Sequence, residues 1–225
     1  MAVYQLLYDE YGPRNWWPGE GPFDVIVGAI LTQAASWKNV ELALSNLKAA
    51  DCWSFKAIDA CPPAELAEIV RPSGYFNAKA AKLQAFAAHV LQQYEGDLDR
   101  MFALDTELLR EELLSIHGIG PETADDILVY AALKPSFVID TYTIRILERL
   151  GIKPGQERPK YGHWQQLFHE QLPAEVQLFN EFHALLDHHA GQSCRKTPVC
   201  NGCCLLDICA TGQAAEAADI ANRPA

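Results

Sequence analysis

The chain has 225 residues, and 49% of them are hydrophobic, which is enough to bury a core as one large or two small domains. No apolar run is long enough to cross a bilayer, so no membrane partner is expected. The N-terminus, MAVYQLLYDEYG, lacks the basic start and apolar stretch of a signal peptide, which favours a cytoplasmic protein. The formal net charge of −11 excludes a uniformly basic surface and weakens long-range steering toward polyanions.

Hydrophobic residues recur at spacings of three and four through most of the chain, and no series of strands is evident, which predicts an all-α fold. The segment 24–35 is apolar on nearly every side and is expected to be a central buried helix. The tail after Cys209 is rich in alanine, lacks bulky apolar residues and is expected to be a loose extension. Further helices are expected at 77–94, 105–116, 121–132, 140–150, 161–171 and 174–190.

Two of the expected helices meet at the turn His117-Gly118-Ile119-Gly120. Both glycines allow backbone conformations that other residues resist, and their missing side chains let an anion approach the backbone N–H groups. Pro121 suits the first turn of the second helix, whose N-terminal dipole also favours an anion. Ile119 is expected to pack inward and hold the turn. The pattern favours binding of a DNA phosphate, and the alternative is an ordinary tight connection between helices.

Asp140 follows the apolar residues Phe137-Val138-Ile139 and comes just before the helical run TYTIRILERL. An aspartate at this place is commonly an N-cap, and the helix N-terminus keeps its carboxylate ionised. An ionised carboxylate that is partly shielded from water can stabilise a sugar oxocarbenium ion and can orient or deprotonate a water molecule. The structural and catalytic roles are compatible. Asp140 is therefore the candidate catalytic residue for cleavage of an N-glycosidic bond, by analogy with glycoside hydrolysis.

Four cysteines near the C-terminus are spaced as Cys194-x5-Cys200-x2-Cys203-x5-Cys209, and a fifth, Cys204, is left as a spare. In an intracellular protein such a group indicates a metal site more often than disulfides. A zinc ribbon usually has two C-x-x-C pairs, whereas this loop has one. Four thiolates in one short loop favour a [4Fe–4S] cluster over zinc.

In this order, the hairpin, the aspartate and the cysteine loop resemble the endonuclease III branch of the helix–hairpin–helix DNA glycosylases. The loop has one residue fewer between its first two ligands than the family's iron–sulfur spacing. The segments NWWPGEGPF, RPSGYFN and GIGPETAD look closest to the bacterial 3-methyladenine glycosylases related to endonuclease III. The resemblance covers about residues 20–210, and its main stretches are AILTQAAS, SGYFNAKAAKL, SIHGIGPETADDILVYA, FVIDTYTIRIL and CRKTPVCNGCCLLDIC.

The resemblance implies an all-α fold of two lobes with a DNA cleft between them. One lobe is a six-helix barrel at residues 23–133, with the helix–hairpin–helix at 107–132. The other is a discontinuous lobe of residues 1–22 and 134–212 that carries the iron–sulfur cluster, followed by a tail at 213–225. The expected partner of the monomer is double-stranded DNA containing a damaged base, and in a bacterium the protein would be nucleoid-associated.

The resemblance also assigns roles to single residues. Asp140 matches the family's catalytic aspartate. Gln33 matches a glutamine that fills the gap left by the extruded nucleotide, although it could simply be a polar residue ending a buried helix. Glu122 stands where bifunctional members carry the lysine that forms a Schiff base, so its presence puts AP-lyase activity in doubt. Glu122 has a structural role available in the first helical turn, and it could also position water or shape the pocket.

Trp16 or Trp17 is expected to stack on a flipped alkylated purine, because the resemblance gives N-terminal aromatics this role and a cationic base attracts aromatic faces. The alternative is that one tryptophan packs under the interface of the two lobes. Other features have simpler interpretations. Lys79, Lys82, Arg195 and Lys196 are candidate phosphate contacts, and His188 and His189 are expected to cap a helix end or face solvent.

These observations predict a monofunctional base-excision-repair DNA glycosylase that hydrolyses the N-glycosidic bond of an alkylated purine such as 3-methyladenine. The first alternative is a bifunctional endonuclease III, both glycosylase and AP lyase, acting on oxidised pyrimidines. The second alternative is a non-catalytic DNA-binding protein that a metal site stabilises.

Overall fold

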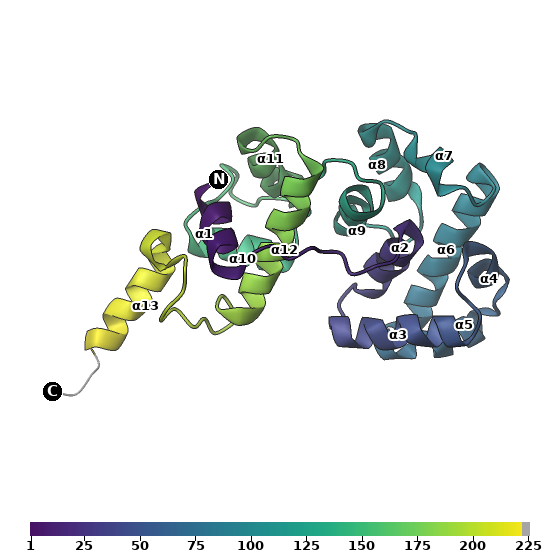
Figure 1. Ribbon diagram of the computed structural model, residues 1–225, viewed down its shortest axis with the longest axis horizontal. Helices are drawn as coiled ribbons and strands as arrows, with labels where there is room; N and C mark the ends of the chain where they lie inside the picture. Colours follow the sequence, from purple (N-terminus) through teal and green to yellow (C-terminus); the bar gives the residue numbers. More distant parts are fainter. Residues whose placement is uncertain (222–225) are drawn as a thin grey trace. The chain divides into compact units, whose positions relative to one another are not determined.

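The computed structural model describes residues 1–221, and it describes the side chains of residues 1–217. Every regular element within residues 1–221 is helical, which confirms the predicted all-α fold. The chain divides into two compact units, whose helices are drawn in Figure 1. We call Trp17–Lys134 the hairpin unit. The cysteine-loop unit combines Met1–Trp16 with the chain from Pro135 onwards.

The hairpin unit is a set of helices packed around α2 and α6. Every residue of α2 from Val25 to Leu31 is buried, as its apolar sequence predicts. The long helix α6 buries one face, which includes Leu83, Phe86 and Val90. The helices of this unit are α2 (Pro22–Leu31), α3 (Trp37–Ala49), α4 (Phe55–Ala60), α5 (Pro63–Ile69), the 3-10 helix η1 (Arg71–Ser73), α6 (Phe76–Tyr94), α7 (Leu98–Phe102), α8 (Thr106–Ser115), α9 (Pro121–Asp126) and η2 (Ile127–Ala131).

The single helix predicted at 121–132 has two parts. It is α-helical in α9 and π-helical in η2, where all five residues are buried. A π-helical turn is wider than an α-helical turn because its hydrogen bonds span five residues, as the bond from the Ala132 N–H to the Ile127 carbonyl does at 2.9 Å. The chain then leaves the helix through the exposed Leu133, whose φ of 51° is left-handed.

The cysteine-loop unit is organised around α12. Helices α1 and α10 both pack against α12. The segment before α10 is anchored by Phe137, which stacks on Phe168 of α11 with ring centroids 3.6 Å apart. This buried segment leads directly to Asp140. The helices of this unit are α1 (Ala2–Tyr11), α10 (Thr141–Arg149), α11 (Tyr161–Gln171), α12 (Val176–Gln192), the 3-10 helix η3 (Leu206–Ile208) and α13 (Ala210–Ala221).

The tail after Cys209 is a helix, so the prediction of a loose extension is wrong. Alanine has the highest intrinsic helix propensity, and the alanine-rich sequence of α13 follows that preference. The start of α13 is also anchored, because the Thr211 hydroxyl donates a hydrogen bond to the Arg149 carbonyl at 3.0 Å. The last four residues of the predicted tail, 222–225, lie outside the described residues.

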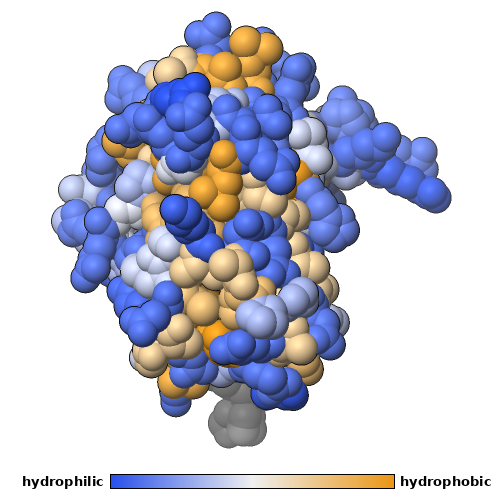
Figure 2. Space-filling view, turned by 90° about the vertical axis from the view of Figure 1, so that its right-hand side faces the viewer, coloured by the Kyte–Doolittle hydropathy of each residue, from blue (hydrophilic) through white to orange (hydrophobic). Residues whose placement is uncertain are grey.

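No helix among the described residues is long and apolar enough to span a membrane. The face of the molecule drawn in Figure 2 mixes hydrophobic and hydrophilic residues, and blue or pale residues interrupt the orange ones. Single exposed apolar side chains are ordinary on protein surfaces. Tyr75 and Leu133 combine high exposure, 75% and 68%, with a left-handed backbone.

Candidate functional site

The predicted hairpin turn connects α8 to α9. Gly118 has a φ of 83°, which is the left-handed conformation that favours glycine. Gly120 has a φ of −93° and a ψ of 177°, which any residue can adopt, so the prediction of unusual backbone angles is wrong for Gly120. A Cβ atom on Gly120 would meet no atom within 4 Å. Its missing side chain therefore leaves open space at the N-terminus of α9, where the helix dipole favours an anion.

Ile119 lies between the two glycines and packs inward, with 5% of its surface exposed. Its backbone N–H donates to the Ile116 carbonyl at 3.1 Å. This N–H is therefore committed to the turn, and Ile119 contributes to the hairpin by packing. The start of α9 is the part of the hairpin left to meet an anion.

Gln33, just beyond the C-terminal end of α2, is hydrogen-bonded to the hairpin. Its Nε2 donates to Thr123 Oγ1 at 2.8 Å and to the Gly118 carbonyl at 3.3 Å, and its Oε1 accepts from Lys82 Nζ. The Lys82 methylenes also fill the space beside Gly118, where an added Cβ would lie 2.2 Å from Lys82 Cγ. One polar network thus joins the end of α2, helix α6 and the hairpin turn.

Lys79 is buried, so its prediction as a phosphate contact is wrong. Its side chain is 1% exposed, and its ammonium donates to the Leu31 carbonyl at 2.8 Å and to the Ser73 carbonyl at 2.6 Å. Burial, with a smaller contribution from the neighbouring Lys82, lowers the pKa of Lys79 to about 8. The amphipathic pattern of α6 did not show that two backbone carbonyls stabilise a lysine on its buried face.

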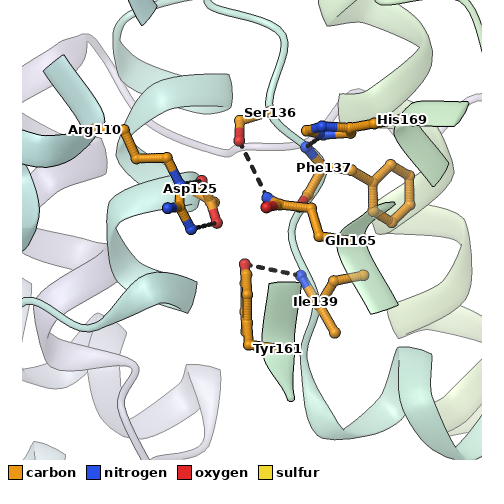
Figure 3. A network of polar contacts seen from close by, with 8 residues as sticks. All are labelled: Arg110, Asp125, Ser136, Phe137, Ile139, Tyr161, Gln165 and His169. Carbon is orange, nitrogen blue, oxygen red and sulfur yellow. Dashed lines mark hydrogen bonds and ion pairs between the residues drawn. The ribbon is translucent and has the colours of Figure 1, made fainter. Parts of the chain in front are cut away.

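An ion pair between Arg110 and the buried Asp125 joins the two helices of the hairpin. Arg110 of α8 donates from Nε and Nη2 to the two carboxylate oxygens of Asp125 in α9, at 2.8 and 3.0 Å (Figure 3). Asp125 is fully buried, so loss of the arginine would remove both of these charged hydrogen bonds from a carboxylate in the core. The pair fixes the relative position of the two hairpin helices, which sequence reasoning did not anticipate.

Asp140 is the N-cap of α10, as predicted. Its Oδ1 accepts a hydrogen bond from the Thr143 backbone N–H at 2.6 Å, and its own carbonyl accepts from the Ile144 N–H at 3.2 Å. The Asp140 side chain is half-buried and follows the buried residues Phe137–Ile139. The helix N-terminus therefore orients the carboxylate, and the apolar segment limits its contact with water.

Side chains of α11 hold the backbone that leads to Asp140 (Figure 3). The Phe137 N–H donates to His169 Nε2 at 3.0 Å, and the Ile139 N–H donates to the Tyr161 hydroxyl oxygen at 3.2 Å. Gln165 donates from Nε2 to the Phe137 carbonyl at 2.8 Å. Each of these side chains satisfies a backbone group that has no partner strand, so the extended segment keeps one conformation.

A second carboxyl group, that of Asp187 on α12, interacts with Asp140. Although much of the Asp187 side chain is exposed, desolvation raises its pKa, the Asp140 carboxylate raises it further, and His183 partly offsets the shift. Sequence reasoning did not single out Asp187. The packing of α10 on α12 brings the two carboxyl groups into electrostatic contact.

Glu122, the residue predicted in place of a lysine nucleophile, is exposed in the first turn of α9. An acidic side chain there interacts favourably with the N-terminal end of the helix dipole. Its carboxylate cannot attack a sugar carbon to form a Schiff base.

The two predicted base-pocket tryptophans belong to different units, because the boundary falls between them. Trp17 packs within the hairpin unit, with ring centroids 5.3 Å from Trp37 and 5.4 Å from Tyr130. A Cβ on Gly28 would lie 2.9 Å from the Trp17 ring, so this glycine makes room for the indole. Trp17, which is half-buried, is thus held by aromatic contacts inside its own unit.

Trp16 ends the N-terminal part of the cysteine-loop unit, after an anchored turn. The buried Glu181 carboxylate of α12 accepts hydrogen bonds from the backbone N–H groups of Arg14 and Asn15, the second at 3.4 Å. Asn15 has a left-handed φ of 51°. This turn fixes the backbone that presents Trp16, which is half-buried.

The four predicted ligand thiols line one cavity with apolar residues that include Ile146 and Leu205, whereas Cys204 does not line it. Within the described residues, no three histidine, cysteine, aspartate or glutamate side chains converge closely enough to hold a single metal ion. Four thiols around one cavity supply the all-sulfur ligand set that a [4Fe–4S] cluster uses. The thiols that line it are Cys194, Cys200, Cys203 and Cys209.

Arg149, at the C-terminal end of α10, holds this loop. Its guanidinium donates to Cys194 Sγ at 3.1 Å and to the carbonyls of Arg195 and Lys196 at 2.7 and 3.0 Å. Its own carbonyl accepts a hydrogen bond from Cys209 Sγ at 3.5 Å. The helix that begins at Asp140 therefore ends in direct contact with the cysteine loop.

His189 is buried beside the same loop, so the expectation of a capping or solvent-facing side chain is wrong for it. Its Nδ1 lies 2.9 Å from the Tyr11 hydroxyl, and its Nε2 lies 3.8 Å from Cys203 Sγ. Burial, with a smaller contribution from His188, lowers the pKa of His189 to about 4, so the ring is neutral near pH 7. In the sequence, only its place near the end of α12, just before the cysteine loop, indicates that it lies beside that loop.

Comparison with known proteins agrees with this architecture. Residues 27–173 match the model of the HhH-GPD superfamily of base excision DNA repair proteins. A Methanocaldococcus jannaschii protein, whose assignment as a DNA repair glycosylase is itself provisional, is 42% identical over 92% of this chain and 94% of its own length. Endonuclease III of Sulfolobus acidocaldarius is 30% identical over 83% of this chain and 81% of its own.

Solved structures show the same fold. The H. pylori 3-methyladenine DNA glycosylase MagIII bound to 1,N6-ethenoadenine is 29% identical with a TM-score of 0.72, covering 85% of this chain and 96% of that one. A trapped endonuclease III–DNA covalent intermediate is 20% identical with a TM-score of 0.82, covering 96% of each chain. The chain belongs to the HhH-GPD superfamily of base excision DNA repair proteins. Within it, the chain is a DNA N-glycosylase.

Replacing Gly118 by alanine is expected to weaken binding to undamaged duplex DNA by about tenfold, because the left-handed backbone and the Lys82 side chain both oppose a Cβ. The measurement is fluorescence anisotropy with a labelled duplex at fixed, low salt. Gly155→Ala is the matched control, since a Cβ there meets nothing within 4 Å and its φ is not left-handed. Equal affinities of the two variants would contradict the role given to the turn.

Proposed function

We propose that the chain is a monofunctional glycosylase that releases an alkylated purine, such as 3-methyladenine, from double-stranded DNA by hydrolysis. The observation that carries this proposal is the position of Asp140. Its carboxylate caps α10 through Thr143 and follows a buried apolar segment, so it is oriented and partly shielded. Such a carboxylate can stabilise the positive charge that develops on the sugar as the base departs.

The chemistry requires little more from the protein when the base is cationic. A methylated purine already carries a positive charge and leaves readily, so an electrostatic partner and a positioned water are sufficient. Asp140 Oδ1 is held by the Thr143 N–H, which fixes the plane of the carboxylate. The carboxylate can then orient the attacking water or accept its proton.

The proposal of a monofunctional enzyme rests on Glu122. A carboxylate at this exposed position of α9 cannot form a Schiff base with the sugar. Water is therefore the nucleophile, and the product is an abasic site with an intact strand. Similarity to endonuclease III of Sulfolobus acidocaldarius favours one alternative, a bifunctional enzyme acting on oxidised pyrimidines.

The choice of an alkylated purine is supported by Trp16 and by one relative. Trp16, which follows the turn anchored by Glu181, is the tryptophan proposed to stack on the extruded base. An aromatic face attracts a cationic base more strongly than a neutral one. The H. pylori relative is a 3-methyladenine DNA glycosylase, and its structure holds an ethenoadenine.

The hairpin unit is proposed to bind the DNA backbone and to probe the bases. The open N-terminus of α9 beside Gly120 suits a phosphate. Gln33, through its amide, and Tyr75, through its exposed ring, are the proposed base contacts, since aromatic side chains stack on any base. With a net charge of −11 on the whole chain, non-specific affinity is expected to be modest and to fall quickly with salt.

We further propose that Cys194, Cys200, Cys203 and Cys209 hold a [4Fe–4S] cluster. The thiols supply the all-sulfur ligand set such clusters use, and the cavity they line supports the assignment. When bound, the cluster would cross-link the loop between α12 and α13. Arg149 donates to Cys194 Sγ and is placed to neutralise part of the thiolate charge.

Asp140→Asn is expected to reduce base release from 3-methyladenine DNA by at least about 100-fold while leaving duplex affinity unchanged, because asparagine still caps the helix but carries no charge. Single-turnover release from a panel of duplexes, each with one lesion, measures both the loss and the substrate. Asp97→Asn, which alters the N-cap of α7, is the matched control and should release base at the wild-type rate.

Base release by Asp140→Asn at the wild-type rate would contradict the assignment of Asp140 as the catalytic residue. A wild type that releases no base from any duplex would instead favour the non-catalytic alternative.

Borohydride treatment during the reaction is expected to give no covalent protein–DNA adduct, because water rather than a lysine attacks the sugar. The measurement is a gel-shift of labelled, damaged duplex under denaturing conditions, with an endonuclease III as the positive control. A trapped adduct at stoichiometric yield would replace the monofunctional proposal by the bifunctional one.

Cys203→Ser is expected to lose the iron and the brown colour of the purified protein, whereas Cys204→Ser should retain both, since Cys203 lines the cavity and Cys204 does not. Iron and sulfide analysis of anaerobically purified protein, together with the visible absorption spectrum, makes the comparison. Equimolar zinc in the wild type, or equal iron loss in both variants, would rule out the proposed ligand set.

A further inference from the structure

Two loops of the hairpin unit end in the side chains proposed to contact bases. One loop follows α2 and carries Gln33, two residues after Leu31. The other follows η1 and carries Tyr75, two residues after Ser73. Both loops contain left-handed residues, with a φ of 53° at Ala34 and of 44° at Tyr75. Loops with such backbone angles persist only when their surroundings determine them.

The ammonium of Lys79 joins these two loops. It donates to the Leu31 carbonyl at 2.8 Å and to the Ser73 carbonyl at 2.6 Å. The Lys79 backbone N–H also donates to the Tyr75 carbonyl at 3.0 Å. One residue therefore fixes both loops two residues before Gln33 and Tyr75, and it fixes the second loop at two points.

Burying an ammonium is costly, and this one is 1% exposed. The Leu31 carbonyl lies at the C-terminal end of α2, where the helix dipole is negative and favours a cation. A methionine of similar length would fill the same volume without that cost. It would leave the two carbonyls without their shared donor, so the lysine adds a connection that apolar packing cannot provide.

Resting on the proposed function, we infer that Lys79 is a positioning residue for base extrusion, which holds the Gln33 and Tyr75 loops in one fixed relation so that both side chains meet the DNA together. Lys79 does not touch DNA itself. Its neighbour Lys82 has the complementary role, because it holds the Gln33 side chain against the hairpin in the DNA-free protein.

Lys79→Met is the test, and Val90→Ala is its matched control, since Val90 is fully buried on the same helix and contacts neither carbonyl in question. Extrusion is read from the fluorescence of 2-aminopurine placed next to a lesion, and affinity is read from anisotropy with the same duplex. Lys79→Met is expected to lose at least about tenfold in the extrusion equilibrium with less than about threefold change in affinity. Val90→Ala should lower the melting temperature without shifting extrusion.

Amide hydrogen exchange on the DNA-free protein provides a second readout that does not depend on glycosylase activity. Lys79→Met should exchange faster in both loops, at residues 32–35 and 73–76, with the hairpin turn unchanged. Lys79→Arg, which keeps a donor, should restore part of the protection. Faster exchange throughout the unit, or wild-type extrusion by Lys79→Met, would overturn the inference.

The two proposals fail in different ways. If wild-type protein releases no base, the proposed function fails, and the exchange data still decide whether Lys79 couples the loops. If wild-type protein releases base and Lys79→Met does so equally well, the proposed function stands and the positioning role of Lys79 is rejected.

Discussion

Two structural requirements fix the position of Asp140: burial of the residues before it and capping of the helix after it. The three residues before it must be buried, since Phe137 stacks on Phe168 in the core of the cysteine-loop unit. The helix after it needs an acceptor for its first N–H groups, which the Asp140 carboxylate supplies through Thr143. A charged group is thereby kept at the edge of an apolar core without being desolvated completely. The rest of that unit, from the side chains of α11 to the packing of α10 on α12, serves to keep this boundary where it is.

The hairpin unit has a different structural requirement, because its proposed functional groups are backbone atoms and loops rather than one side chain. A phosphate-binding turn must stay open at the surface and still keep its shape. The solution is a set of polar contacts beneath the turn: the Arg110–Asp125 pair fixes the two helices, and Gln33 and Lys82 fix the turn itself. Asp125 is buried, and the other side chains in these contacts are partly buried, so the contacts favour one arrangement of the turn.

Periodic features of the sequence were sufficient for the all-α fold and for most helix positions, because amphipathic spacing reports directly on burial. The N-cap role of Asp140 was also predictable from the sequence, because capping depends on a few neighbouring residues. Lys79 and His189 were not predictable in this way. Each is stabilised by partners far away in the sequence, and a pattern along one helix contains no information about carbonyls or hydroxyls on another. The helical tail does not follow from burial, because alanine side chains bury little surface. It follows from the high helix propensity of alanine.

Helix α10 has nine residues, with the Asp140 carboxylate at its beginning and the contacts to the cysteine loop at its end. A helix of this length is about 13 Å long and resists bending and compression. It therefore acts as a rigid strut within the unit. The Asp140 carboxylate and the contact to Cys194 are therefore held at a fixed separation by one short, rigid element.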